Sequence, residues 1–207
     1  MKKSPNKVPI LDIVIVNQLI RRRRSIFPQQ FSGEPVEREL VEMMLENANW
    51  APTHGRTEPW RFIVFAGAAR ERLAAQHADL YKQETAPDTF KQDKYETLQI
   101  RPMQASHVIA ICMQADPTGR IPEIEEIEAT ACAVQNLHLT ATALGLAGYW
   151  SSGGMTYHAG MKAILGLEEG ERCLGFFYLG RYAGVWPVGK RHTSGLQKVR
   201  WIGGENE

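Results

Sequence analysis

Residues 122–154, PEIEEIEATACAVQNLHLTATALGLAGYWSSGG, decide how this chain folds. Acidic residues crowd the positions just after Pro122, where carboxylates complement the positive end of a helix dipole. Apolar or small side chains then recur at helical spacing, at Ile127, Ala131, Val134, Leu137 or His138, Ala141 and Leu144. The small residues allow another backbone to approach closely. The sequence therefore predicts one long, buried helix that Gly145 ends.

Shorter patterns on both sides of this helix predict the other elements. Helices are expected over residues 11–22, 35–48, 68–82 (an amphipathic surface helix) and 155–165. Strands are expected over residues 61–65, 107–113 and 174–179, with a short strand or turn at 149–150. Residues 83–104 are polar, dotted with aromatic side chains and weakly periodic, as in a mobile flap. Helices that alternate with about four strands predict an α/β or α+β fold.

Composition limits the kinds of function. The chain has 207 residues, of which 43% are hydrophobic, and its formal net charge is +1. These values suit one globular domain over residues 1–207 and argue against disorder or a disulfide scaffold. Near-neutrality argues against a general nucleic-acid or membrane-surface binder, although residues 1–24 carry seven basic groups and one acid.

The cysteines and the apolar stretches predict the compartment. Cys112, Cys132 and Cys173 are odd in number and far apart, which suits a reducing environment. The basic N-terminus lacks a small-residue cleavage site, so no secretory signal is expected. The uncharged stretch 129–161 is too polar to be a membrane span. We expect a cytoplasmic protein without a nucleic-acid or membrane partner.

Three familiar kinds of site have no support in the residues. Residues 184–190 match the first seven positions of a phosphate-binding P-loop, but Arg191 stands where a magnesium-binding serine or threonine belongs. A GxGxxG motif is missing, which argues against a Rossmann nicotinamide domain. The six histidines show no ligand spacing, so no metal site is expected.

The run Arg21-Arg22-Arg23-Arg24-Ser25 follows a predicted helix and allows two interpretations. The arginines could be a solvated helix C-terminus, where cations complement the dipole. Alternatively, guanidinium groups and the serine hydroxyl surround a phosphate with forked donors. The run alone does not decide between them.

Two further segments favour a bound ligand. Residues 51–62, APTHGRTEPWRF, place a polar loop between a helix and a strand, where planar heterocycles are commonly held. Residues 148–154, GYWSSGG, place aromatic bulk before small residues that allow close backbone approach. Taken singly, each segment could also be a simple connector or turn.

The order and spacing of four motifs resemble the FMN-dependent nitroreductase family, and its short YdjA-type members in particular. The motifs are Arg-Arg-Ser, Ala-Pro-x-His before Pro-Trp-x-Phe, the long helix ending Gly-x-x-Gly-x-Trp-x-Ser-Gly, and Gly-Phe-x-Tyr-Leu-Gly. The resemblance covers about residues 10–182. The resemblance implies an α+β fold with a central, mainly antiparallel sheet flanked by helices. It also implies an intertwined homodimer with FMN at the interface, residues 183–207 being an extension that packs on the partner subunit, and residues 1–9 being flexible.

The resemblance also implies which residues bind the cofactor. Arg23, Arg24 and Ser25 match the segment that contacts the FMN phosphate and ribityl chain. Trp50 and His54 match positions that reach the flavin from the other subunit, and Trp150, Ser151 and Ser152 match the segment against the flavin ring. Lys190 and Arg191 match a basic C-terminal phosphate contact, and residues 140–145 match a stretch proposed to contact the nicotinamide.

Departures from the family pattern concern charge. Trp50 and Ser151 stand where the short members have arginine, so we expect Arg56, Arg181 or Arg191 to replace the missing cations. Glu58 stands where many relatives have glutamine, and we expect it to point away or to pair with an arginine.

The implied activity is reduction of a small oxidant, a nitroaromatic, quinone or enone, by NAD(P)H through flavin N5 in ping-pong fashion, without a dedicated catalytic acid. Two alternatives stay open. One is a flavin-binding or sensing protein with little turnover, suggested by Trp50 and Ser151. The other is a basic-arm interaction module, which rests on the arginine run alone.

Overall fold

The structure, a computed structural model, describes residues 12–203. The predicted flexible residues 1–9 lie outside this range. The helices of the described range are α1 (Ile13–Arg22), α2 (Arg38–Ala48), α3 (Ala68–Glu84), α4 (Gln92–Gln104), α5 (Glu123–Ala143) and α6 (Ala159–Leu165), and the short 3-10 turns are η1 (Pro28–Gln30), η2 (His54–Arg56) and η3 (Gly195–Lys198). The strands are β1 (Trp60–Ala66), β2 (His107–Gln114), β3 (Leu146–Ser151) and β4 (Glu171–Arg181).

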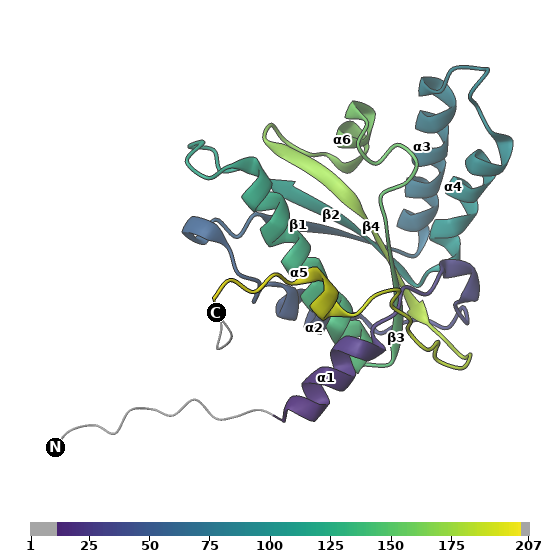
Figure 1. Cartoon of the computed structure of the whole chain (residues 1–207). Helices are drawn as coiled ribbons and strands as arrows, with labels where there is room; N and C mark the ends of the chain where they lie inside the picture. Colours follow the sequence, from purple (N-terminus) through teal and green to yellow (C-terminus); the bar gives the residue numbers. More distant parts are fainter. Residues whose placement is uncertain (1–11, 204–207) are drawn as a thin grey trace.

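The strands form one antiparallel sheet in the order β1-β2-β4-β3, with helices on both faces (Figure 1). Successive side chains of a strand point to opposite faces. Accordingly, Ile109 and Ile111 of β2 pack in one core with α2 and α5, whereas Val108 and Ala110 pack in another with α3 and α6. This is the α+β architecture that the family resemblance implies, and one of the two that the residue pattern left open.

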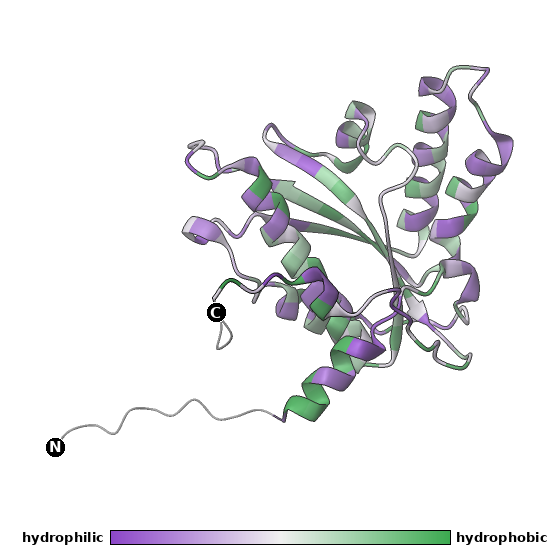
Figure 2. Ribbon diagram, in the orientation of Figure 1, coloured by the Kyte–Doolittle hydropathy of each residue, from purple (hydrophilic) through white to green (hydrophobic). Residues whose placement is uncertain are grey.

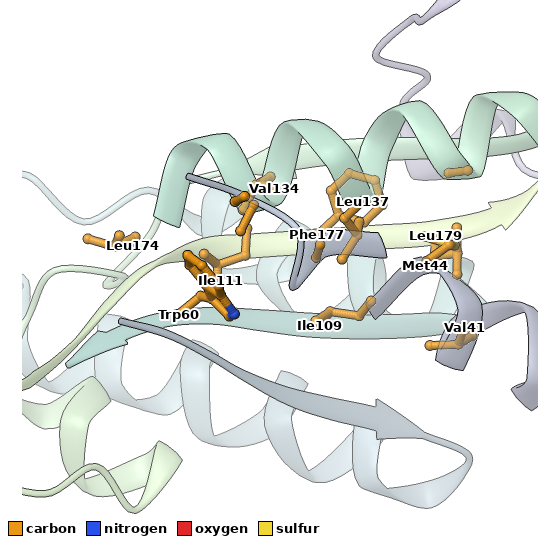
Figure 3. Packing of buried hydrophobic residues seen from close by; sticks show 14 of the residues in the cluster. Val41, Met44, Trp60, Ile109, Ile111, Val134, Leu137, Leu174, Phe177 and Leu179 are labelled. Atoms are coloured by element: carbon orange, nitrogen blue, oxygen red, sulfur yellow. The ribbon is translucent and has the colours of Figure 1, made fainter. Parts of the chain in front are cut away.

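The long helix α5 lies directly on the sheet. Val134 and Leu137 of α5 lie beside Ile111 and Phe177 of the sheet, and all four are almost fully buried (Figure 3). Fully burying a side chain of this kind contributes about 1.5–3 kcal/mol. The predicted helix and its small-residue contact surface are therefore confirmed, within a residue at each end.

The predicted flap differs from the structure. Residues 92–104 form helix α4, although their apolar spacing is weak, because α4 packs against α3. Phe90 stacks on Tyr81 of α3 at 5.4 Å between ring centroids, and the Lys94 ammonium lies 4.5 Å from the Tyr81 ring. Tertiary packing thus stabilises a helix that the local pattern does not reveal. Helix α3 buries one face, as expected of the predicted amphipathic surface helix.

Helix α2 begins at Arg38, three residues after the predicted start. The Val36 N–H donates to the Ser106 hydroxyl at 2.7 Å, which holds residues 35–37 in extended conformation against the start of β2. Glu37, with ψ 142°, is the N-cap, so the helix cannot include the preceding proline.

Helix α1 has an apolar surface that the rest of the chain does not cover. Its first turn is strongly hydrophobic (Figure 2), yet none of its residues is buried. Ile13 and Ile15 are both more than 60% exposed. Among the helices of residues 12–203, none is both long and apolar enough to cross a bilayer.

Candidate active site

The arginine run lies beside β3 and under α5. Ser25 forms a parallel β-bridge with Gly148, and the Ile26 N–H donates to the Gly148 carbonyl at 3.1 Å. From α5, His138 Nε2 donates to the Arg24 carbonyl at 3.0 Å. The structure therefore brings residues 23–25 next to the strand that leads into Trp150.

The C-terminal segment lies across the same run. Trp186 Nε1 donates to the Arg22 carbonyl at 2.7 Å, and Arg24 Nε donates to the Pro187 carbonyl at 2.9 Å. Gly189 is so close to Arg24 that a Cβ there would collide with the guanidinium. Residues from both ends of the chain thus enclose a cavity of about 840 Å³, lined by Ile20, Arg21, Arg22, Arg24, Trp186, Pro187, Val188, Gly189 and Arg191.

Positive charges converge here, and no carboxylate of the described residues pairs with them. Burial, followed by the positive charges of Arg24 and Arg191, lowers the pKa of Arg23 below its usual value. Within residues 12–203, neither the arginines of the run nor Arg191 forms an ion pair with a carboxylate. Convergent guanidinium groups repel one another unless an anion lies between them. The geometry favours the phosphate interpretation of the run over the solvated one.

Trp150 and the residues after it lie at the end of β3, the strand that pairs with Ser25. The Trp150 indole, 38% exposed, lies against Gly175 of β4, where a Cβ would collide with its ring. A Cβ at Gly148 would likewise collide with the Phe177 ring. The Ser151 hydroxyl accepts the Gly153 N–H at 3.3 Å, whereas Ser152 is exposed. Gly148 therefore allows β3 to approach Phe177 closely, and Gly175 leaves room for the Trp150 indole on β4.

The loop that carries His54 is anchored at the other end of α5. His54 Nδ1 and Glu125 Oε2 are 2.5 Å apart, and the Thr57 hydroxyl donates to Glu126 Oε2 at 2.8 Å. Glu126 is fully buried, and its second carboxylate oxygen has no partner among the described residues. Arg56 and Glu58 both adopt positive φ, 58° and 46°, a strained conformation for residues other than glycine.

The predicted site residues therefore fall into two groups. Arg23, Arg24, Ser25 and Arg191 come together, with the segment Trp150, Ser151 and Ser152 next along β3 and Lys190 exposed beside Arg191. His54 and Arg56 do not join them, and Trp50 lies on a separate face near the second half of α5. Glu125 and His138 are thirteen residues apart on α5, so the His54 loop and the arginine run lie about 20 Å apart along the helix axis.

Trp50 lies on an open face near the second half of α5. Its side chain is 80% exposed, beside a cavity of about 420 Å³ whose other walls include Leu19, Asn47, Thr140 and Leu144. The predicted nicotinamide stretch 140–145 thus contributes to the same face as Trp50.

Among the arginines considered as replacements for the missing cations, Arg181 is already engaged. Its guanidinium donates to the Pro35 carbonyl at 3.0 Å and pairs with Glu37 at 2.5 Å. Arg191 instead approaches Arg23, and Arg56 is exposed on the distant loop. Glu58 is exposed and has no ion-pair partner in the described part of the chain.

Two buried histidines near the site were not predicted. His138 fits the apolar stripe of α5 about as well as Leu137, and this spacing was the sequence feature that could have indicated its burial. His77 of α3 accepts the Met155 N–H through Nε2 at 2.9 Å, a contact that sequence spacing does not indicate.

Comparisons with known proteins identify the family of this chain. The profile of the nitroreductase family matches residues 20–181. The Bacillus subtilis protein YfhC, provisionally named an NAD(P)H nitroreductase, is 28% identical over 179 residues, 86% of this chain and 90% of that protein. Escherichia coli YdjA, named in the same provisional way, is 28% identical over 143 residues, 69% and 75% of the two chains.

Solved structures extend the similarity to the whole fold. A nitroreductase-like family protein from Bacillus cereus has a TM-score of 0.77 and 28% identity, covering 96% of this chain and all of that one. The FMN-dependent nitroreductase NfnB of Mycobacterium smegmatis, solved with NADPH, has a TM-score of 0.71 at 21% identity, covering 93% and 100%, which supports the fold alone. The matched profile covers most of the chain, and this protein belongs to the nitroreductase family.

Proposed function

We propose that this protein is an FMN-dependent NAD(P)H oxidoreductase of the nitroreductase type that reduces a small nitroaromatic, quinone or enone. The observation that carries the proposal is the convergence of Arg23, Arg24 and Arg191 without a carboxylate partner in the described residues. Three guanidinium groups and the Ser25 hydroxyl suit a dianionic phosphate monoester such as that of FMN.

The residues that would hold FMN follow from this placement. Arg23, Arg191 and Ser25 would hold the phosphate, with Arg24 and Lys190 beside them. Trp150, Ser151 and Ser152 would lie against the ring. Ser25 pairs with Gly148 of β3, and these three residues follow Gly148 along the chain. Bound FMN supplies hydride transfer at N5, the chemistry that side chains lack. The protein contributes cations and backbone N–H donors that stabilise negative charge on the reduced ring.

A second subunit would complete the site. His54 and Arg56 are about 20 Å from the arginine run along α5, and we propose that these residues serve the flavin of the partner subunit instead of the one in their own chain. The exposed apolar surfaces of α1 and Trp50 are suited to burial in an interface. We propose an intertwined homodimer in which Trp50, His54 and Arg56 face the partner's flavin and the C-terminal extension contacts the partner subunit.

The substrates would use one site in turn. NAD(P)H and then the oxidant would occupy the exposed side of the flavin ring, which gives ping-pong kinetics. The three free cysteines, two of them buried, suit a reducing compartment, and we place the protein in the cytoplasm.

Absorbance spectroscopy of the purified protein tests the proposal. We expect flavin bands in the near-ultraviolet and blue that bleach with NADH or NADPH without oxygen and return with menadione or nitrofurazone. A colourless protein that takes up no FMN would contradict it. A yellow protein that neither nicotinamide reduces would favour a flavin-binding or sensing role, for which Ser151 and Trp50, in place of arginine, are the specific observations.

A further inference from the structure

His77 of α3 contacts the turn that follows β3. The imidazole is 3% exposed, and Nε2 accepts the Met155 N–H at 2.9 Å. The ring also packs against Phe176 of β4, with 5.5 Å between ring centroids. One buried side chain thus connects α3 to the segment Trp150–Met155, which carries the residues assigned to the flavin ring.

Gly154 lets the turn after β3 pack between α3 and α4. Gly154 has φ +72°, and a Cβ there would collide with the His77 ring and with Leu98 of α4. Within the turn, the Thr156 hydroxyl donates to the Gly153 carbonyl at 2.8 Å. The backbone therefore has little freedom on the side that faces His77, and its position depends on this contact.

The protonation state of His77 suits an acceptor. Burial lowers its pKa to about 4, and the positive charges of Lys94 and Arg101 on α4 act in the same direction. The ring is therefore neutral near pH 7, with a lone pair on Nε2 and the proton on Nδ1. A protonated ring would present an N–H to the Met155 N–H and the hydrogen bond would be lost.

Two backbone donors of the same turn are free. The N–H groups of Ser152 and Gly154 have no acceptor within residues 12–203. Unpartnered N–H groups held in fixed directions are suited to stabilising negative charge on a ligand. Their directions are constant only while the turn keeps its conformation.

We propose that His77 is a positioning residue: by accepting the Met155 N–H, it fixes the conformation of the turn whose Ser152 and Gly154 N–H groups would donate to the flavin ring. The inference rests on the proposed function, which places the ring against this turn. It adds a contribution from α3, an element outside the motifs of the family resemblance. The competing role is packing alone, in which the ring serves only to fill space beside Phe176.

Two variants separate these roles. His77→Gln keeps an acceptor near the position of Nε2 but lacks the aromatic ring. His77→Phe keeps a ring against Phe176 but has no acceptor. Positioning predicts that the glutamine variant resembles wild type and that the phenylalanine variant does not, whereas packing alone predicts the reverse order.

The first measurement is amide hydrogen exchange in flavin-free protein, followed in the peptide that contains residues 151–158. We expect exchange about tenfold faster in His77→Phe, the factor that corresponds to the loss of one hydrogen bond, and within about twofold of wild type in His77→Gln. A peptide from β2 is the internal control and should exchange equally in all three proteins. Unchanged exchange in His77→Phe would overturn the proposal.

The second measurement is the visible spectrum and dissociation constant of FMN in the same proteins. We expect a shifted flavin band and weaker FMN binding in His77→Phe alone. If circular dichroism shows that this variant does not fold, Gly154→Ala, which forces the turn away from His77, takes its place with the same expected result. Wild-type protein that binds no FMN would contradict both the proposed function and this role, whereas normal FMN binding in wild type and in His77→Phe would contradict the role of His77 alone.

Discussion

The Trp186 indole donates its N–H to the carbonyl oxygen of Arg22 at 2.7 Å, joining the C-terminal segment to the end of α1 across 164 positions of sequence. This bond and the one from Arg24 to Pro187 place Arg191 near Arg23. The cation cluster therefore depends on the C-terminal segment, and a change in Trp186, which lines the cavity, should alter how the cations are arranged.

Trp186→Phe should weaken FMN binding about tenfold. The variant keeps an aromatic side chain and removes a single N–H donor, and one hydrogen bond contributes about 1 kcal/mol or slightly more. FMN titration followed by flavin absorbance measures the effect. Trp201→Phe is the matched control, because Trp201 is 81% exposed in the same C-terminal segment. Equal dissociation constants for the two variants would mean that the segment does not organise the site.

Gly148→Ala should destabilise the fold, because a Cβ would collide with Phe177, a fully buried ring with no room to move. Overpacking of this kind costs about 1–3 kcal/mol. Gly153→Ala, on the same segment, would bring its Cβ no closer than 3.6 Å to the Ser151 hydroxyl oxygen and should leave the free energy of unfolding nearly unchanged. Urea denaturation of both variants compares them, and equal midpoints would count against the close approach of β3 and β4.

Removing the Thr57 hydroxyl should cost more than removing the charge of Glu125. Thr57→Val leaves the buried Glu126 carboxylate without its donor, at a cost of about 1–3 kcal/mol. Glu125→Gln breaks an exposed contact with His54, which contributes about 1 kcal/mol or less. Thermal unfolding ranks the two variants. A smaller loss for Thr57→Val would show that Glu126 is not held as described.

Stability should fall as the pH decreases from 7 to 5, because His77 and His138 are buried and neutral. Burial lowers the pKa of each to about 4, and the charge of Arg23 acts in the same direction on His138. The unfolded chain, with histidine pKa near 6.5, then binds more protons than the folded one, so this stability is present above pH 6.5 and is lost towards pH 4. The loss between pH 7 and pH 5 is about 2 kcal/mol for each histidine.

Urea denaturation at both pH values measures this dependence, and His77→Gln should show about half of it. Carboxylates such as Asp116, whose pKa is lowered by hydrogen bonds from Thr118, titrate below this window and do not obscure it. A wild-type free energy of unfolding that is the same at pH 7 and pH 5 would contradict the burial of both imidazoles in neutral form.

The parts of the fold that the sequence predicts are those with a strong local pattern. The long helix and three of the strands follow from apolar spacing and glycine breaks, and the resemblance of four motifs predicts the antiparallel arrangement. Helix α4 is not predicted, because its stability comes from contacts such as that of Lys94 with the Tyr81 ring of a different helix. Helix propensity depends on local sequence and does not predict packing between distant residues.

The candidate site shows the same division. Arg23, Arg24 and Ser25 stand in a recognisable motif, so their role can be predicted from the sequence. The approach of Arg191 depends on Trp186 and Pro187, and the role of His77 depends on Gly154 entering between two helices. These contacts join residues far apart in the sequence. A lone histidine or tryptophan in the sequence does not indicate which distant residue it contacts.

FMN titration of Arg23→Ala tests the central claim most directly. We expect the dissociation constant to rise at least about tenfold, because a guanidinium–phosphate hydrogen bond contributes about 1.5–3 kcal/mol. Arg72→Ala, which removes an exposed arginine of α3, is the matched control and should bind FMN like wild type. Unchanged FMN affinity in folded Arg23→Ala protein would contradict the account, because the phosphate would then lie elsewhere.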